Sequence, residues 1–189
     1  MQYIKGFENY HNERQTAITL GKFDGLHRGH ELLVERVIAF KKQEAVDAVV
    51  FAFDMQPLYE KLGQEYRPLL SGEEKAARLQ GRIDYFVECP FTEEISSMEA
   101  EDFIRRVLVE RFHVKYIVVG NDFRFGHKRH GDVQMLQEYA ERFDYQLEVL
   151  EKICYGGREI SSTYIKEERD KGNAALVDEL LGYVYTVRK

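Results

Sequence analysis

The sequence predicts an α/β fold with a doubly wound parallel sheet of about five strands and helices on both faces. Short apolar runs alternate with segments of helical periodicity about five times along the chain. The runs are apolar throughout rather than at every second residue, which is typical of strands covered on both faces. A length of 189 residues with a hydrophobic fraction of 44% fits one folded domain.

Each expected strand is a short run rich in β-branched and aromatic residues that ends at a turn signal. Gly21 closes the first, Pro90 the third and Gly120 the fourth. The strands are expected at residues 17–20, 48–53, 85–89, 116–119 and 146–150. Strands in this alternation with helices build a Rossmann-like sheet, in which ligands bind beyond the carboxyl ends of the strands.

The expected helices are marked by apolar residues three and four apart. Ser71 and Glu74 form a capping box, and Ser96 or Ser97 is expected to cap the clearest helix, residues 98–112. The helices are expected at residues 29–42, 71–80, 98–112, 133–143, 163–171 and 174–181. No linker interrupts this pattern, so residues 1–181 are expected to form one domain and residues 182–189 a short tail.

Composition narrows the class of partner. The chain has 27 Lys and Arg against 33 Asp and Glu, a net charge of −6, which disfavours nucleic acids and anionic membranes as partners. A phosphate-bearing small molecule needs only a local positive site. The sequence has no 18-residue apolar stretch and no apolar signal region, and Cys89 and Cys154 form no C-x-x-C pair. A cytoplasmic location is therefore expected.

The strongest chemical signal follows the first strand, where residues 21–30 read GKFDGLHRGH. Its glycines allow tight turns, and a helix that begins near Gly29 offers free N–H groups to a phosphate. His27 and His30 are spaced to face one point, which suits a phosphoryl group that gains charge during transfer. The alternatives are half of a metal site or surface histidines, although zinc would need a third ligand that the local sequence lacks.

Two later segments add candidate binding groups. Ser161, Ser162 and Thr163 precede a helical pattern and can form a second phosphate site or an ordinary N-cap. Residues 123–125, FRF, suit stacking against a flat heteroaromatic ring, or else form a hydrophobic plug over the sheet edge. Asp122 can accept a hydrogen bond from a ring N–H.

Residues 21–30 resemble the G-x-F-D-G-x-H-x-G-H signature of the FAD synthetase (FMN adenylyltransferase) domain of bacterial bifunctional riboflavin kinase/FAD synthetases, in the HxGH nucleotidyltransferase superfamily. Three further segments are similar to motifs of that family, in the same order: FDMQP at 53–57, GNDFRFG at 120–126 with Arg129, Gly131 and Asp132, and REISSTYIK at 158–166. The resemblance spans about residues 16–181 and implies the HxGH nucleotidyltransferase fold.

The resemblance implies that FMN and ATP are converted to FAD and pyrophosphate with Mg²⁺, which is held mainly by phosphate oxygens and water. It implies catalytic roles for His27, His30 and Lys166. The implied ATP-binding residues are Gly21, Phe23, Asp24, Gly25, His27, His30, Arg158, Ser161, Ser162, Thr163 and Lys166. The implied flavin-binding residues are Phe53, Gln56, Pro57, Asp122, Arg124 and Phe125.

Some positions depart from the family pattern. Gln56 replaces a histidine, and Met55 replaces a proline, while Tyr164 and Lys166 stand where arginine is common. These changes leave two alternatives open: a flavin- or nucleotide-binding protein with weakened turnover, or a related nucleotidyltransferase with another acceptor. Residues 182–189 are too few for a riboflavin kinase domain, so a separate kinase is expected to supply FMN.

Overall fold

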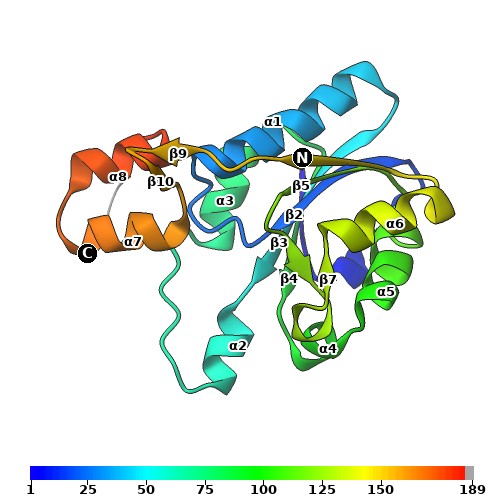
Figure 1. Cartoon of the computed structure of the whole chain (residues 1–189), viewed down its shortest axis with the longest axis horizontal. Helices are drawn as coiled ribbons and strands as arrows, with labels where there is room; N and C mark the ends of the chain where they lie inside the picture. The colour runs from blue at the N-terminus through cyan, green and yellow to red at the C-terminus, as the bar shows by residue number, and fades with distance from the viewer. Residues whose placement is uncertain (186–189) are drawn as a thin grey trace.

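The computed structural model describes residues 1–185, which form a six-stranded parallel sheet with helices on both faces (Figure 1). The strand order is β1-β4-β3-β2-β5-β8, and every neighbouring pair is parallel. The strands of this sheet are β1 (Gln2–Lys5), β2 (Thr16–Gly21), β3 (Asp47–Asp54), β4 (Tyr85–Pro90), β5 (Val114–Gly120) and β8 (Gln146–Leu150). The predicted doubly wound α/β class is confirmed.

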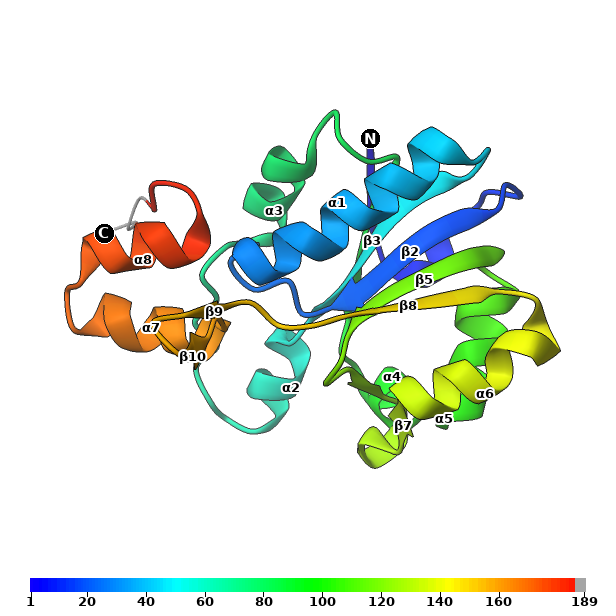
Figure 2. The same ribbon diagram turned by 45° about the horizontal axis from the view of Figure 1, so that its top comes forward.

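Helices pack on the sheet in two layers, which Figure 2 shows on opposite sides of the strands. The helices are α1 (Arg28–Gln43), α2 (Gln56–Lys61), α3 (Gly72–Leu79), α4 (Glu93–Ser97), α5 (Ala100–Asp102), α6 (Val133–Phe143), α7 (Ser162–Asp170) and α8 (Ala174–Leu181), with a π-helix, η2 (Phe103–Val109), and the 3-10 turns η1 (Phe7–Asn9) and η3 (His127–Arg129). Two small hairpins complete the fold: β6 (Arg124–Phe125) with β7 (Gly131–Asp132), and β9 (Cys154–Tyr155) with β10 (Arg158–Glu159).

Successive side chains of a strand point to opposite faces of the sheet, so the hydrophobic core has one part on each face. In β2, Ile18 packs with α4, α5, η2 and α6, whereas its neighbour Ala17 packs with α1 and α3. Helices α7 and α8 form a third apolar cluster with Leu69 and Ile160. Figures 1 and 2 place this pair at one end of the sheet, beside the start of α1. The carboxyl ends of the strands therefore face α7 and α8, which belong to neither layer.

Two expectations need correction. The sheet has a sixth strand, β1, which the sequence analysis missed because it is a short edge strand with exposed ends. The segment expected as one helix over 98–112 consists of α5 and then η2, and neither Ser96 nor Ser97 caps it. Those serines belong to α4, which Thr92 caps. In η2, hydrogen bonds to the fifth preceding residue, such as Glu110 N–H to Arg105 C=O, widen the helix.

One local prediction is confirmed at the start of α3. Ser71 and Glu74 form the predicted capping box at the start of α3. Helix α8 ends at Gly182, and residues 186–189 of the expected tail lie outside the described residues. In residues 1–185, no helix is both long and apolar enough to cross a membrane.

Candidate active site

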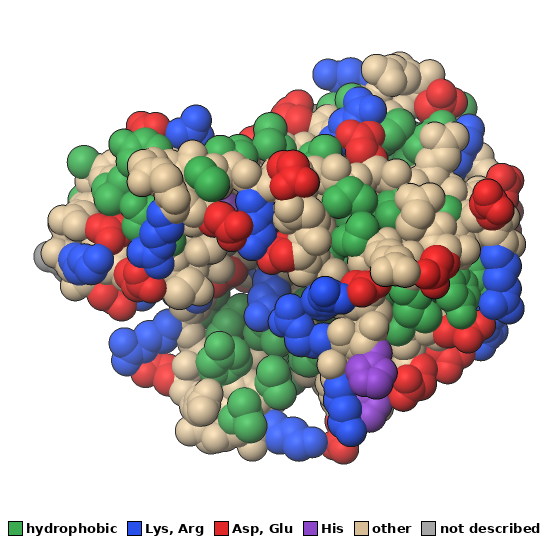
Figure 3. Space-filling view, viewed as in Figure 1, with side chains coloured by type: hydrophobic (Ala, Val, Ile, Leu, Met, Phe, Trp, Pro, Cys, Tyr) green, Lys and Arg blue, Asp and Glu red, His purple; other side chains and the backbone are tan. Residues whose placement is uncertain are grey.

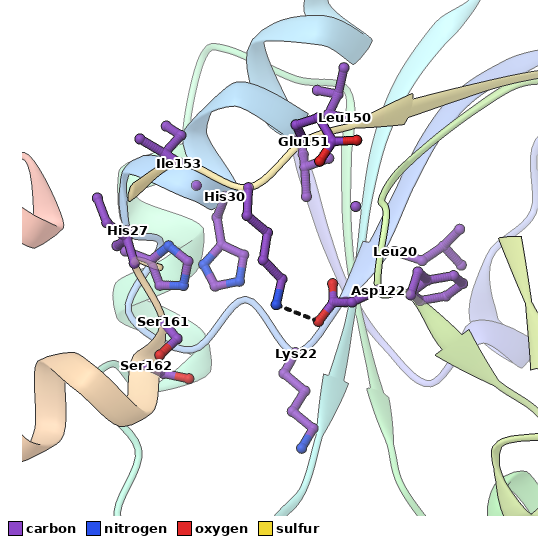
Figure 4. A pocket seen from close by; sticks show the side chains of 17 residues that line it. Leu20, Lys22, His27, His30, Asp122, Leu150, Glu151, Ile153, Ser161 and Ser162 are labelled. Atoms are coloured by element: carbon purple, nitrogen blue, oxygen red, sulfur yellow. Dashed lines mark ion pairs between the residues drawn. The ribbon is translucent and has the colours of Figure 1, made fainter. Parts of the chain in front are cut away.

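The switch point of the sheet lies between β2 and β5. After β2 the chain adds β3 and β4 on one side, and after β5 it adds β8 on the other side. Two cavities open there, one of about 260 Å³ and one of about 500 Å³. They share a wall made of Gly21, Lys22, Asp122 and Phe123, which follow the ends of β2 and β5. Figure 4 shows the smaller cavity. Two ligands can therefore meet at this wall.

His27 and His30 line the smaller cavity as a stacked pair, with ring centroids 3.7 Å apart and planes inclined by 24°. His27 is the N-cap residue of α1, and its carbonyl accepts the N–H of Glu31 at 3.0 Å. Phe23 packs against the His30 ring at 4.9 Å between centroids. The predicted convergence of the two imidazoles is what the fold produces, because the helix begins between them.

The electrostatics of the pair follow from burial. Burial lowers the pKa of His27 to about 4, against a weaker opposing effect of Asp24. Burial, and then the adjacent His27, lower the pKa of His30 well below its usual value. The Nδ1 atom of each ring is buried and has no hydrogen-bond partner among residues 1–185. Both rings are therefore neutral near pH 7 and retain unused hydrogen-bonding capacity.

The loop between β2 and α1 is fixed by unusual backbone geometry and by Asp24. Phe23, Gly25 and Leu26 all have positive φ, and a Cβ on Gly25 would lie 2.7 Å from Cδ1 of Leu69. One oxygen of the buried Asp24 accepts the N–H of Leu69 at 2.7 Å. The other lies 2.5 Å from Nζ of Lys166. Lys166 thus contacts the loop carboxylate, and it does not line either cavity.

The start of α7 supplies part of the predicted ATP side. Ser161 and Ser162 line the smaller cavity, and Figure 4 shows both near His27. The Ser161 hydroxyl accepts the N–H of Tyr164 at 3.2 Å, so the expected N-cap is present. Thr163 is exposed and lies outside the lining of the cavity. Arg158 also lies outside it and pairs with Glu167 at 2.7 Å.

The larger cavity matches the predicted flavin side only in part. Its wall is mainly aromatic and aliphatic. The apolar lining residues are Phe53, Met55, Leu58, Phe91, Ile95, Phe103, Phe123 and Phe125, and the charged ones are Lys22, Asp122, Arg124 and Arg129. Figure 3 shows hydrophobic and basic side chains next to one another in the hollow beside α2. Gln56 and Pro57 do not line it, since Gln56 is exposed and donates to Glu60 at 2.6 Å.

Two lysines of the site, Lys22 and Lys152, were not among the residues predicted from the sequence. Lys22 lies directly after β2 and lines both cavities, and its place beside Gly21 in the GKFDGLHRGH segment was the available signal. Lys152 follows β8, and its Nζ lies 2.8 Å from a carboxylate oxygen of Asp122 and 2.8 Å from one of Glu159. The dashed line that ends at Asp122 in Figure 4 marks the first of these ion pairs. Asp122 was expected to receive a ring N–H, and in this structure it pairs with Lys152.

The described residues bring no three His, Cys, Asp or Glu side chains together as a metal site. A magnesium ion in the smaller cavity would therefore depend on ligand phosphates and water for its coordination. The arrangement supplies two neutral imidazoles, two helix N-termini and nearby cations around one space, which suits the binding and transfer of phosphoryl groups.

Comparisons with known proteins place the chain in a family. The model of the FAD synthetase family matches residues 9–164. Bifunctional riboflavin kinase/FMN adenylyltransferases of Escherichia coli K12 and of Buchnera aphidicola from Acyrthosiphon pisum are each 30% identical to this chain. Each alignment covers 99% of this chain and 61% of the relative, so the chain spans about three fifths of the length of these relatives.

A solved structure described as a macrolide-efflux protein from Streptococcus pneumoniae has the same fold. It superimposes with a TM-score of 0.82 at 22% identity, and the match covers 97% of this chain and 62% of the other. That likeness concerns the fold alone. The family model matches more than half of the chain and shows that this chain belongs to the FAD synthetase family.

Proposed function

We propose that the chain is an FMN adenylyltransferase that makes FAD and pyrophosphate from FMN and ATP. The observation that carries this proposal is the pair of adjoining cavities at the switch point. Among apolar neighbours, the smaller one includes imidazoles, hydroxyls and lysines suited to a triphosphate, and the larger one is lined mainly by aromatic and aliphatic groups suited to a flavin. In this proposal the two reacting phosphates meet at the wall that the cavities share.

In the proposed reaction, an oxygen of the FMN phosphate attacks the α-phosphorus of ATP and pyrophosphate leaves from the opposite side. Both the nucleophile and the leaving group are ionised near neutral pH, so positioning and charge stabilisation matter more than a general base. His27 and His30 donate hydrogen bonds to the phosphate oxygens, and the N-termini of α1 and α7 attract the same charge. Mg²⁺ neutralises the phosphates when it is bound.

The remaining assignments are proposals of the same kind. Ser161 and Ser162 hold the triphosphate, while Phe53, Phe123 and Phe125 hold the flavin ring. Riboflavin kinase activity, which the names of the relatives pair with adenylyl transfer, would supply the FMN. Lys166 would contact phosphate only after it leaves Asp24, so a direct catalytic role requires this ion pair to break.

The test is to incubate the purified chain with FMN and Mg-ATP and to separate the products by chromatography. FAD and pyrophosphate should form in equal amounts, and a parallel reaction with riboflavin should give no FAD. Absence of FAD at micromolar enzyme would refute the proposal.

Two observations favour a second candidate, a flavin- or nucleotide-binding protein without turnover. Lys166 is held in an ion pair with Asp24, and Gln56 lies outside the lining of the larger cavity. Calorimetric binding of FMN or ATP with no release of pyrophosphate would identify that case.

A further inference from the structure

The cations that surround the two cavities differ in whether an acidic side chain neutralises them. The Lys and Arg residues that line the cavities are Lys22, Arg124, Arg129 and Lys152. Lys152 contacts two carboxylates, and Arg124 lies 2.5 Å from Asp132. Within residues 1–185, neither Lys22 nor Arg129 has an acidic side chain within ion-pair distance. Two cations of the larger cavity, Lys22 and Arg129, are therefore without an ion pair among the described residues.

Lys22 is the one of these two that lines both cavities. It follows directly after β2, and Figure 4 shows its side chain extending away from the rings of His27 and His30. Most of the remaining wall of the larger cavity is apolar and includes Phe53, Phe91 and Phe103. A ligand that fits this arrangement has a flat apolar ring at one end and an anionic group at the other.

The charges around Lys22 also favour an anionic group of the ligand at this position. Lys22 is exposed, but the protein atoms around it partly desolvate its ammonium group, which is the first cause that lowers its pKa. Repulsion from Arg129 lowers this pKa further, Asp24 opposes the shift, and Lys166 adds a smaller lowering. An anion bound between Lys22 and Arg129 would relieve this repulsion and form charge-assisted hydrogen bonds. A neutral ligand can accept a hydrogen bond from either cation, but it brings no negative charge to relieve their repulsion.

We propose that Lys22 binds the terminal phosphate of the flavin and thereby makes the site prefer FMN to riboflavin. This inference rests on the proposed function, because it takes the occupant of the larger cavity to be a flavin. It assigns to a single side chain the discrimination between two molecules that share the same ring. It also holds the nucleophilic phosphate at the wall between the cavities, next to the space for ATP.

The experiment is a titration of flavin fluorescence with FMN and with riboflavin, in the absence of ATP. The variants are Lys22→Met, Lys22→Arg and, as a matched loss of one exposed positive charge far from the cavities, Lys42→Met. Lys22→Met should weaken FMN binding by about tenfold or more, the scale of a lost hydrogen bond to a charged group, and change riboflavin binding by less than about twofold. Lys22→Arg and Lys42→Met should keep the wild-type preference for FMN.

The outcomes separate the two proposals. If the wild-type chain binds neither flavin, both the proposed function and the role of Lys22 fail. If it prefers FMN and Lys22→Met keeps that preference, the role of Lys22 is wrong while the flavin site stands. An equal loss of FMN and riboflavin binding in Lys22→Met would indicate a structural effect and would also overturn the inference. Riboflavin binding by Lys22→Met shows that the cavity is still folded in this variant.

Discussion

His27 and His30 are suited to their proposed task because they are uncharged. A neutral imidazole has one donor and one acceptor nitrogen, and it can stabilise charge that develops on a phosphoryl group without repelling Mg²⁺. The position of His27 at the start of α1 reinforces this state, since the positive end of a helix dipole disfavours a cation. The stacked geometry directs both rings to the same cavity.

Replacing either histidine by alanine should therefore slow FAD formation. We expect His27→Ala and His30→Ala each to lower kcat by about 10²-fold, the effect of losing one preorganised donor, with a smaller change in the KM for ATP. Steady-state rates from chromatographic detection of FAD measure this effect. Thermal unfolding of each variant controls for loss of structure. Full activity in both folded variants would show that the pair has no catalytic role.

The depressed pKa of His27 also predicts how stability depends on pH. The folded-state pKa is about 4 and the ordinary value is 6.5, so the unfolded chain binds more protons between these pH values. Stability contributed by neutral His27 is fully present above pH 6.5 and is lost as the pH falls towards 4. The loss at pH 4 should be on the order of 2–3 kcal/mol.

Urea unfolding of the wild type and of His27→Gln at several pH values between 4 and 7 isolates this contribution. The difference in unfolding free energy between the two proteins should shrink as the pH falls, because glutamine does not titrate. His11→Gln, at an exposed position, serves as the control and should follow the wild-type profile. Parallel profiles of wild type and His27→Gln would contradict the prediction.

At the scale of elements, the loop of residues 22–27 between β2 and α1 depends on contacts from distant parts of the chain. Asp24 accepts the N–H of Leu69 and pairs with Lys166 of α7. The hydroxyl of Tyr183, just after α8, donates to the carbonyl of Gly25. These contacts hold a backbone with several positive φ angles, which would otherwise relax. Helices α7 and α8 are thereby coupled to the proposed phosphate site.

A double-mutant cycle on Asp24 and Lys166 tests this coupling between elements. Lys166→Met should lower the unfolding free energy by about 2 kcal/mol, because it leaves the buried Asp24 carboxylate without its cation. The double variant with Asp24→Asn should lose less than the sum of the single losses, with a coupling energy of about 1–2 kcal/mol.

The control is the same cycle on Lys61 and Glu93, a pair 3.0 Å apart whose side chains are 63% and 80% exposed. Water screens that pair, and its coupling should be close to zero. Equal coupling in both cycles would mean that the contact between α7 and the loop contributes nothing beyond a surface ion pair.

The elements that the sequence predicted well are those whose signals are local. The capping box of Ser71 and Glu74 and the apolar run of β5 depend on neighbouring residues alone. Strand β1 carries no such signal, because Gln2 and Lys5 are exposed and the strand exists only through pairing with β4. The widened helix η2 likewise depends on how Phe103 and its neighbours pack on the sheet.

The same distinction applies to the candidate site. His27 and His30 lie within one turn, so their convergence could be inferred from spacing. The contacts of Lys166 with Asp24 and of Lys152 with Asp122 join residues far apart in the chain, and no pattern along the sequence indicates them.

At the scale of the whole molecule, the order of the strands determines where the two ligands would meet. Because β2 and β5 are neighbours, the segments that follow them form a common wall, with Lys22 from one and Asp122 from the other. The cavities lie on either side of this wall and draw their remaining residues from different elements. The fold therefore predicts two separate sites that are occupied together, rather than one site for which the ligands compete.

This arrangement predicts additive stabilisation by the two substrates. FMN and Mg²⁺ with α,β-methylene-ATP, whose α–β bridge resists cleavage, should each raise Tm by about 5–10 °C at a hundredfold excess over the dissociation constant. Together they should raise Tm by more than either alone, since each binds the folded chain in its own cavity. Thermal unfolding measured at constant ionic strength, with sodium chloride as the control, checks this. If the ATP analogue instead displaced FMN and the two shifts failed to add, both ligands would be competing for one cavity, and adenylyl transfer across the shared wall would be impossible.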